Sequence, residues 1–186
     1  MRGAPMTELR FRALARADYA LLGRWLATAH VARWWHHDPR PEAIERDFGA
    51  VVDRRDPADV FIVELDASPV GLFQRYTFAD NPAYRDELAP LVDVAPGALS
   101  VDYFVGEPAA LRCGVATAML RAGVAAIWRD HPAAPAVVVP VVAANVASWR
   151  ALERAGFARV AEGPLAPDNP IDDDLHVVYR IERPAR

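Results

Sequence analysis

Lysine, cysteine and long apolar runs are the features that this 186-residue sequence has little or none of. All 21 basic residues are arginine, and Cys113 is the single cysteine. One cysteine excludes an internal disulfide and a cysteine-based zinc site, and it suits a reducing compartment. No run of 18 apolar residues occurs, and residues 1–10 lack the apolar segment of a signal peptide. We therefore expect a cytoplasmic protein with no membrane partner.

The charge and the phosphate-binding motifs narrow the function further. The net charge of −4 excludes general nucleic-acid binding by a basic face. Without lysine there is no Walker motif, and no G-x-G-x-x-G follows a predicted strand. The sequence therefore lacks the motifs of the common mononucleotide- and dinucleotide-binding sites. With 53% hydrophobic residues, the chain can bury a substantial core. We expect one domain over residues 1–186, as a monomer or a homodimer.

The hydrophobic pattern predicts an α+β order of elements. Strands are expected at 9–14, 60–65, 70–78, 98–106, 136–142, 157–163 and 175–182. Helices are expected at 18–29, 41–54, 114–129 and 145–156, opened by Asp18, Pro41 and Asn145 and with Gly156 at the end of the last. Residues 30–41 and 79–97 are expected as loops, the latter with short turns. Pro140 predicts an edge or a bulge in its strand.

The stretch LRCGVA at 111–116 joins a strand to an apolar helix. Gly114 permits a close approach of the backbone, and the first N–H groups and the dipole of the helix favour a pyrophosphate. An ordinary strand–helix turn is the alternative that the loop alone leaves open.

The order of segments over residues 99–157 resembles the GNAT superfamily of N-acetyltransferases. The strand VDYFVG is followed by the loop LRCGVA, an apolar helix, a strand and NVASWRALERAGF. The loop matches the superfamily pattern R/Q-x-x-G-x-G/A except at Leu111. In addition, WLATAHVARWW, VGLFQRY and SVDYFVG are similar to the aminoglycoside 6'-N-acetyltransferases, so that the resemblance covers about residues 9–180.

The resemblance implies a single GNAT-type domain: a mixed central sheet of about seven strands, splayed at the acetyl-CoA site and flanked by about four helices. It also implies that Asp102 is the general base that takes the proton of the acceptor ammonium. Backbone N–H groups near residues 103–105 would bond the thioester carbonyl. Many relatives carry a tyrosine as general acid where Leu152 stands, so we assign no acid, and we expect no metal because the histidines near residues 30–37 lack ligand spacing.

Two sets of binding residues are expected, mainly from the resemblance. For acetyl-CoA they are Tyr103, Phe104, Val105, Leu111, Arg112, Cys113, Gly114, Val115, Ala116, Asn145 and Ser148. For the acceptor they are Trp34, Trp35, Gln74, Tyr76, Tyr84, Asp102, Asp172 and Asp173. Asp172 and Asp173 are included because they lie in an acidic loop, and Asn145 can either cap its helix or contact the cofactor, or do both.

Acidic residues gather in two loops, near residues 80–93 and 168–174. An acidic rim attracts a polycationic acceptor, and an aminoglycoside acetylated at its 6'-amine, as in antibiotic resistance, is our first expectation. The solvated loops of an acidic protein are the alternative. An acyltransferase acting on a siderophore hydroxylysine or another small amine is the second hypothesis, although those enzymes tend to carry histidine where Asp102 stands. A non-catalytic acyl-CoA-binding module is the third.

Overall fold

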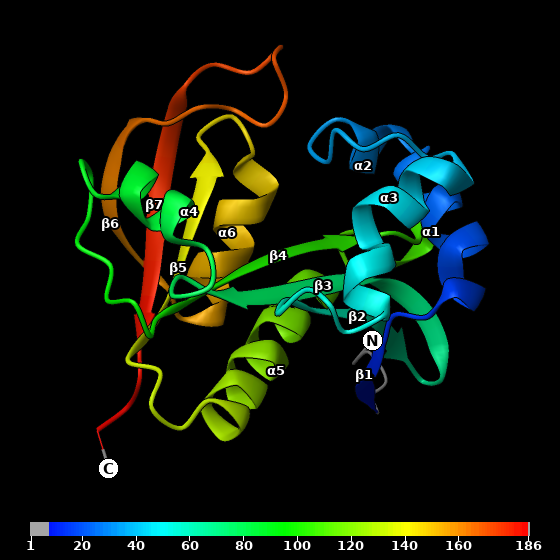
Figure 1. Cartoon of the computed structure of the whole chain (residues 1–186), viewed down its shortest axis with the longest axis horizontal. Helices are drawn as coiled ribbons and strands as arrows, with labels where there is room; N and C mark the ends of the chain where they lie inside the picture. Colours follow the sequence, from blue (N-terminus) through cyan, green and yellow to red (C-terminus); the bar gives the residue numbers. More distant parts are fainter. Residues whose placement is uncertain (1–7, 186) are drawn as a thin grey trace, which may run out of the picture.

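The computed structural model describes residues 8–185 and shows an α+β fold (Figure 1). The strands are β1 (Leu9–Ala13), β2 (Asp59–Leu65), β3 (Ser68–Thr77), β4 (Leu99–Val105), β5 (Ala136–Val142), β6 (Ala158–Pro164) and β7 (Leu175–Glu182). The helices are α1 (Tyr19–Leu26), α2 (Ala29–Ala32), α3 (Pro41–Val52), α4 (Pro82–Leu88), α5 (Val115–Asp130) and α6 (Val146–Ala155), with short 3-10 turns η1 (Arg16–Asp18) and η2 (Pro108–Ala110).

The fold class is confirmed, and the two additional helices are short. Helix α4 lies inside the expected loop 79–97, and α2 begins at Ala29, the last residue of the expected helix 18–29, and continues into the expected loop 30–41. With seven and four residues, these helices are too short to show a helical period. In the described part of the chain, no helix is long and apolar enough to span a membrane.

The seven strands form one mixed sheet in the order β1-β2-β3-β4-β5-β7-β6. Neighbouring strands are antiparallel except β4 and β5, which are parallel and paired only at Leu99 with Val137. Beyond that pair the two strands separate, as Figure 1 shows where β5, β6 and β7 lean away from β4. The predicted opening of the sheet is therefore present.

Pro140 lies in an interior strand, which corrects the expectation of an edge strand or a bulge. It pairs with Val178 of β7, in a regular register. On its other side β5 has no strand partner after Val137, because β4 has already turned away. An interior strand thus tolerates proline where one of its sides is open.

The expected signals set the helix ends in three cases and fail in one. Pro41 opens α3, Asn145 accepts the Ser148 N–H at 3.2 Å at the start of α6, and Gly156 ends α6 with a φ of 104°. Asp18, in contrast, does not cap α1. Its carboxylate accepts two hydrogen bonds from Arg12 and one from the Ala15 N–H, so it stabilises the preceding turn η1 instead.

Two buried clusters fix which strand residues face which side of the sheet. On the side of α5 and α6, Leu99 and Val101 pack with Met119 and Leu120. On the other side, Phe104 packs with the α1–α3 helices. Each large apolar side chain buried there contributes about 1.5–3 kcal/mol. The odd-numbered residues of β4 therefore face α5 and α6, and the even-numbered ones face the opposite side.

Candidate active site

A cavity of about 570 Å³ occupies the opening between β4 and β5. Its walls include Val101 and Tyr103 from one face of β4, and Ser100 and Asp102 from the other face. Because residues of both faces line the same space, the cavity passes through the sheet. Two substrates can thus approach each other from opposite sides of the sheet, and the volume lies in the range of ligand sites.

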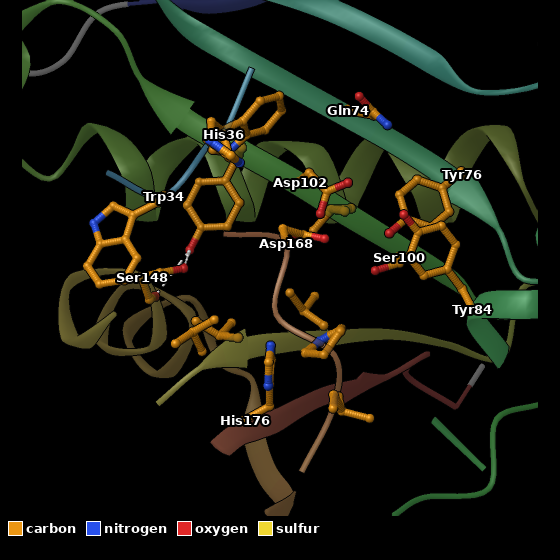
Figure 2. A pocket seen from close by; sticks show the side chains of 18 of the residues that line it. Trp34, His36, Gln74, Tyr76, Tyr84, Ser100, Asp102, Ser148, Asp168 and His176 are labelled. Carbon is orange, nitrogen blue, oxygen red and sulfur yellow. Dashed lines mark hydrogen bonds between the residues drawn. The ribbon is translucent and has the colours of Figure 1, made fainter. Parts of the chain in front are cut away.

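Four polar side chains form a block on the face of α1–α4. Gln74 pairs with Asp102, and Tyr76 pairs with Ser100, across the antiparallel strands β3 and β4. Directly opposed residues share a face of the sheet, so the four side chains are neighbours. Figure 2 shows them on one wall of the cavity, with Asp168 of the β6–β7 loop directed toward Asp102.

Asp102 titrates near neutral pH. Burial and, to a smaller extent, the Asp168 carboxylate raise the pKa of its carboxyl to about 7, and a hydrogen bond with the phenol of Tyr76 opposes the shift. The pKa of Tyr76 is itself raised by burial and by Asp102. A carboxylate with a pKa close to the working pH is suited to accept a proton from a substrate.

The cavity is acidic. The described residues that line it include no arginine. They include six carboxylates: Asp47, Asp56, Glu87, Asp102, Asp168 and Asp172. Two of the six have charged partners. Asp47 accepts from His37 and Arg46, and Asp172 is bound by the guanidinium of Arg33. In the described part of the chain no arginine bonds to Asp102 or Asp168, and Asp168 acts directly on Asp102, so negative charge is concentrated there without a counter-charge.

The predicted acceptor residues are distributed unequally around this cavity. Trp34, Trp35, Gln74, Tyr76, Tyr84, Asp102 and Asp172 line it, whereas Asp173 does not. The role of Asp172 differs from that of a free anion, since its side chain is 3% exposed and forms two hydrogen bonds with Arg33. Together with a bond from the Asn169 amide to the Arg33 carbonyl, it ties the β6–β7 loop to the segment after α2.

The tryptophans are held by packing. The Arg33 guanidinium lies 4.0 Å from the centre of the Trp34 ring, and Trp35 meets Phe104 edge-on at 4.8 Å. Both rings also line the cavity, as flat apolar walls. Trp25 is fully buried and belongs to the core.

The loop before α5 fits the phosphate groups of a coenzyme. Arg112 and Gly114 have φ angles of 61° and 82°, which turn successive backbone N–H groups in one direction. Among residues 8–185, no side chain caps the 16-residue helix and no atom would lie within 4 Å of a Cβ at Gly114; the first turn of the helix holds no acidic residue. The free N–H groups and the helix dipole therefore face open space, an arrangement that suits an anion.

On the α6 side of the opening, Tyr103 and Ser148 form a hydroxyl pair. Their oxygen atoms are 2.9 Å apart, and the Tyr103 O–H also lies 3.1 Å from the Ser148 carbonyl oxygen (Figure 2 labels Ser148). Asn145 lies beside them in the wall. Leu152 is completely buried in the core, so this position offers no proton to a leaving group.

The cavity residues that were absent from the predicted site include three polar ones of interest, Ser100, Asp168 and His176. His176 is buried, and its Nδ1 donates to the Asp174 carbonyl at 2.8 Å in the tautomer that this acceptor requires. The sequence feature that could have identified Ser100 and His176 is the alternation of inward- and outward-facing residues along a strand. Each is a polar residue at an inward-facing position of an apolar strand.

The fold and the site together define a class of protein. The sheet is opened between two parallel strands, the helix that follows β4 has an N-terminus suited to phosphate, and a carboxylate lies in the opening. This is the architecture of an acyltransferase that uses coenzyme A. The Acetyltransferase (GNAT) domain model matches residues 15–165, and the chain belongs to this family. It is therefore an acetyl-CoA-dependent GNAT N-acetyltransferase, which confirms the predicted family, enzyme class and cosubstrate.

Solved structures share the fold over almost the whole chain. An aminoglycoside acetyltransferase AAC(6')-Ib in complex with coenzyme A is 22% identical, with a TM-score of 0.79 and 95% of each chain covered. The same enzyme with coenzyme A and kanamycin gives 21% identity, a TM-score of 0.79 and the same coverage. The ribosomal-protein alpha-N-acetyltransferase RimL with coenzyme A is 15% identical, with a TM-score of 0.71 and 96% of each chain covered. No curated protein matches the sequence.

Proposed function

We propose that this protein, acting as one domain, transfers an acetyl group from acetyl-CoA to a primary amine of a polycationic acceptor, an aminoglycoside at its 6'-amine. The observation that carries the proposal is the pair Asp102 and Asp168 in a cavity whose described lining holds no arginine. This pair stands at the point where the sheet opens. A polycation gains there from both charges, whereas an anionic acceptor is repelled.

In this proposal, Asp102 acts first as an anchor and then as a base. Its carboxylate binds the acceptor ammonium and removes one proton, directly or through one water, which frees the nitrogen lone pair for attack. Bound acetyl-CoA supplies a thioester carbonyl as the electrophile. Between residues 100 and 105, the edge of β4 that faces the opening has no strand partner, so its N–H groups are available to that carbonyl.

The remaining groups hold and orient. The N–H groups at the start of α5 would bind the pyrophosphate, with Gly114 leaving room for it. Tyr103 and Ser148 offer hydroxyl groups on the side of the opening opposite to Asp102. Trp34 and Trp35 offer flat walls to a sugar ring.

The choice of an aminoglycoside rests on the acidic cavity and on the neighbours that bind such compounds. One of these neighbours, AAC(6')-Ib, is described with kanamycin and shares the fold at 21% identity. The test is thiol release from acetyl-CoA with kanamycin, with the linear polyamine spermidine and with a hydroxylysine derivative. We expect kanamycin to have the largest kcat/KM. A preference for either of the others would reassign the acceptor, and coenzyme A binding without turnover on any amine would favour a non-catalytic module.

The carboxylate of Asp168 also gives a pH prediction. It raises the pKa of Asp102, so Asp168→Asn should lower that pKa and move the acidic limb of the kcat/KM profile to lower pH. The same change removes one anionic contact and should lower kcat/KM for a polycation about tenfold at low salt. Steady-state rates between pH 5 and pH 9 measure both effects. An unchanged limb would show that Asp168 does not act on the group that titrates.

A further inference from the structure

Ser100 is a buried hydroxyl whose hydrogen bonding is incomplete. Its residue is 1% exposed, and among the described residues its Oγ forms no hydrogen bond of standard geometry; the phenol of Tyr76 is the polar group beside it. It nevertheless lines the cavity, two positions before Asp102 on the same face of β4. Buried polar side chains are nearly always bonded, and an unbonded one costs folding free energy. The hydroxyl is thus in a place where a ligand can supply the missing bond.

The surroundings of Ser100 differ from those of Asp102. Tyr76 lies opposite Ser100 in the register, and Tyr84 packs on Tyr76 with ring centres 5.8 Å apart (Figure 2). The groups next to Ser100 are therefore neutral hydroxyls, and the phenol of Tyr76 lies near both Ser100 and Asp102, whereas Asp102 also faces the charge of Asp168. Over two strand positions the cavity wall thus changes from neutral hydrogen-bonding groups to a carboxylate that suits a cation.

The spacing limits what can bind at both ends at once. Residues i and i+2 of a strand are separated by about 7 Å along the strand. A ligand whose amine lies at Asp102 can reach Ser100 only with a polar group a few bonds away from that amine. A ring hydroxyl of an amino sugar meets this condition, because it can both donate to and accept from the serine hydroxyl. A linear polyamine places a second nitrogen four or five bonds from the first, but that nitrogen is an ammonium, which only donates and whose charge the neutral hydroxyls beside Ser100 do not compensate.

We propose that Ser100 is a specificity residue, which bonds a hydroxyl on the sugar ring that bears the reacting amine. The acceptor class is then an amino sugar rather than a polyamine. This inference rests on the proposed function, since it takes acetyl transfer at Asp102 as given.

The test compares two acceptors that differ only in ring hydroxyls, kanamycin B and its 3',4'-dideoxy derivative, dibekacin. The unmodified protein should have a higher kcat/KM for kanamycin B. Ser100→Ala should lower kcat/KM for kanamycin B about tenfold, change that for dibekacin less than about threefold, and leave the KM for acetyl-CoA unchanged. The nearly isosteric Ser100→Cys, a weak hydrogen-bonding group, should give the same pattern if the alanine variant folds poorly.

The outcomes separate the two proposals. Turnover with equal losses on both acceptors would show that Ser100 only supports the fold, and it would overturn this inference while the proposed function stands. Loss of the preference for kanamycin B in the variants supports the inference. If neither acceptor is turned over, the result contradicts the proposed function and also the role of Ser100.

Discussion

Asp102→Asn is expected to lower kcat for amine acetylation by two to four orders of magnitude, which is the contribution of a positioned general base. The amide has nearly the shape of the carboxylate, but it cannot accept the ammonium proton. Coenzyme A binding should be unchanged, because the phosphate-suited loop begins beyond the end of β4. Steady-state thiol release at pH 8, together with calorimetric titration of coenzyme A, measures both quantities.

The same variant should be more stable than the unmodified protein at alkaline pH. The pKa of Asp102 is raised in the folded state, from 3.8 to about 7, so folding favours the protonated form. Its contribution is fully favourable below pH 3.8 and is lost as the pH rises to about 7. At pH 8 the asparagine variant therefore avoids an ionisation cost on the order of 2–4 kcal/mol. Denaturant unfolding at pH 5 and pH 8 tests the sign, with the larger gain expected at pH 8.

Asp66→Asn is the matched control, because it removes one negative charge from the exposed β2–β3 turn. Asp66 has a φ of 49°, a conformation that asparagine also tolerates. This control should keep both activity and its pH dependence. An Asp102→Asn variant that is folded and within threefold of the control would exclude Asp102 as the base.

Gly114→Ala is expected to raise the KM for acetyl-CoA at least tenfold while kcat changes little. At a φ of 82° a side chain costs about 1–2 kcal/mol in backbone strain, and the new methyl group stands in the open space above the helix N-terminus. Both effects act on the bound phosphates and neither acts on Asp102. Direct titration with coenzyme A reports the loss without turnover.

Gly97→Ala is the control for this prediction. Its φ is not positive, and a Cβ there would meet only Pro135, at an ordinary contact distance of 3.8 Å. Coenzyme A affinity should be unchanged in this variant. Equal affinity for coenzyme A in Gly114→Ala and in the unmodified protein would show that the loop does not hold the phosphates.

The strands and the cofactor side of the site could be predicted because their signals are local. Alternation in LSVDYFV placed Asp102 opposite the buried Val101, and Gly114 between a strand and an apolar helix marked the start of α5. The Asn145 cap and the Gly156 terminus of α6 follow from the properties of those two residues alone. The prediction that the sheet is splayed at the acetyl-CoA site came from the family resemblance, whereas the missing N–H of Pro140 predicted only an edge or a bulge.

The acceptor side depends on tertiary contacts, which the sequence does not display. Asp172 looked like Asp168 in a run of acidic residues, yet Arg33, 139 positions away, neutralises it. Asp18 is a residue type that commonly caps helices, but its carboxylate instead accepts a hydrogen bond from the side chain of Arg12 on β1. The missing bond of Ser100 is visible only when all of its neighbours are known.

The most direct test of this account is the release of coenzyme A thiol when the purified protein is given acetyl-CoA and kanamycin. The account predicts turnover that saturates in both substrates, a product acetylated on one primary amine, and loss of the signal in Asp102→Asn. A folded protein that binds coenzyme A but releases no thiol with kanamycin or another polycationic amine would contradict it.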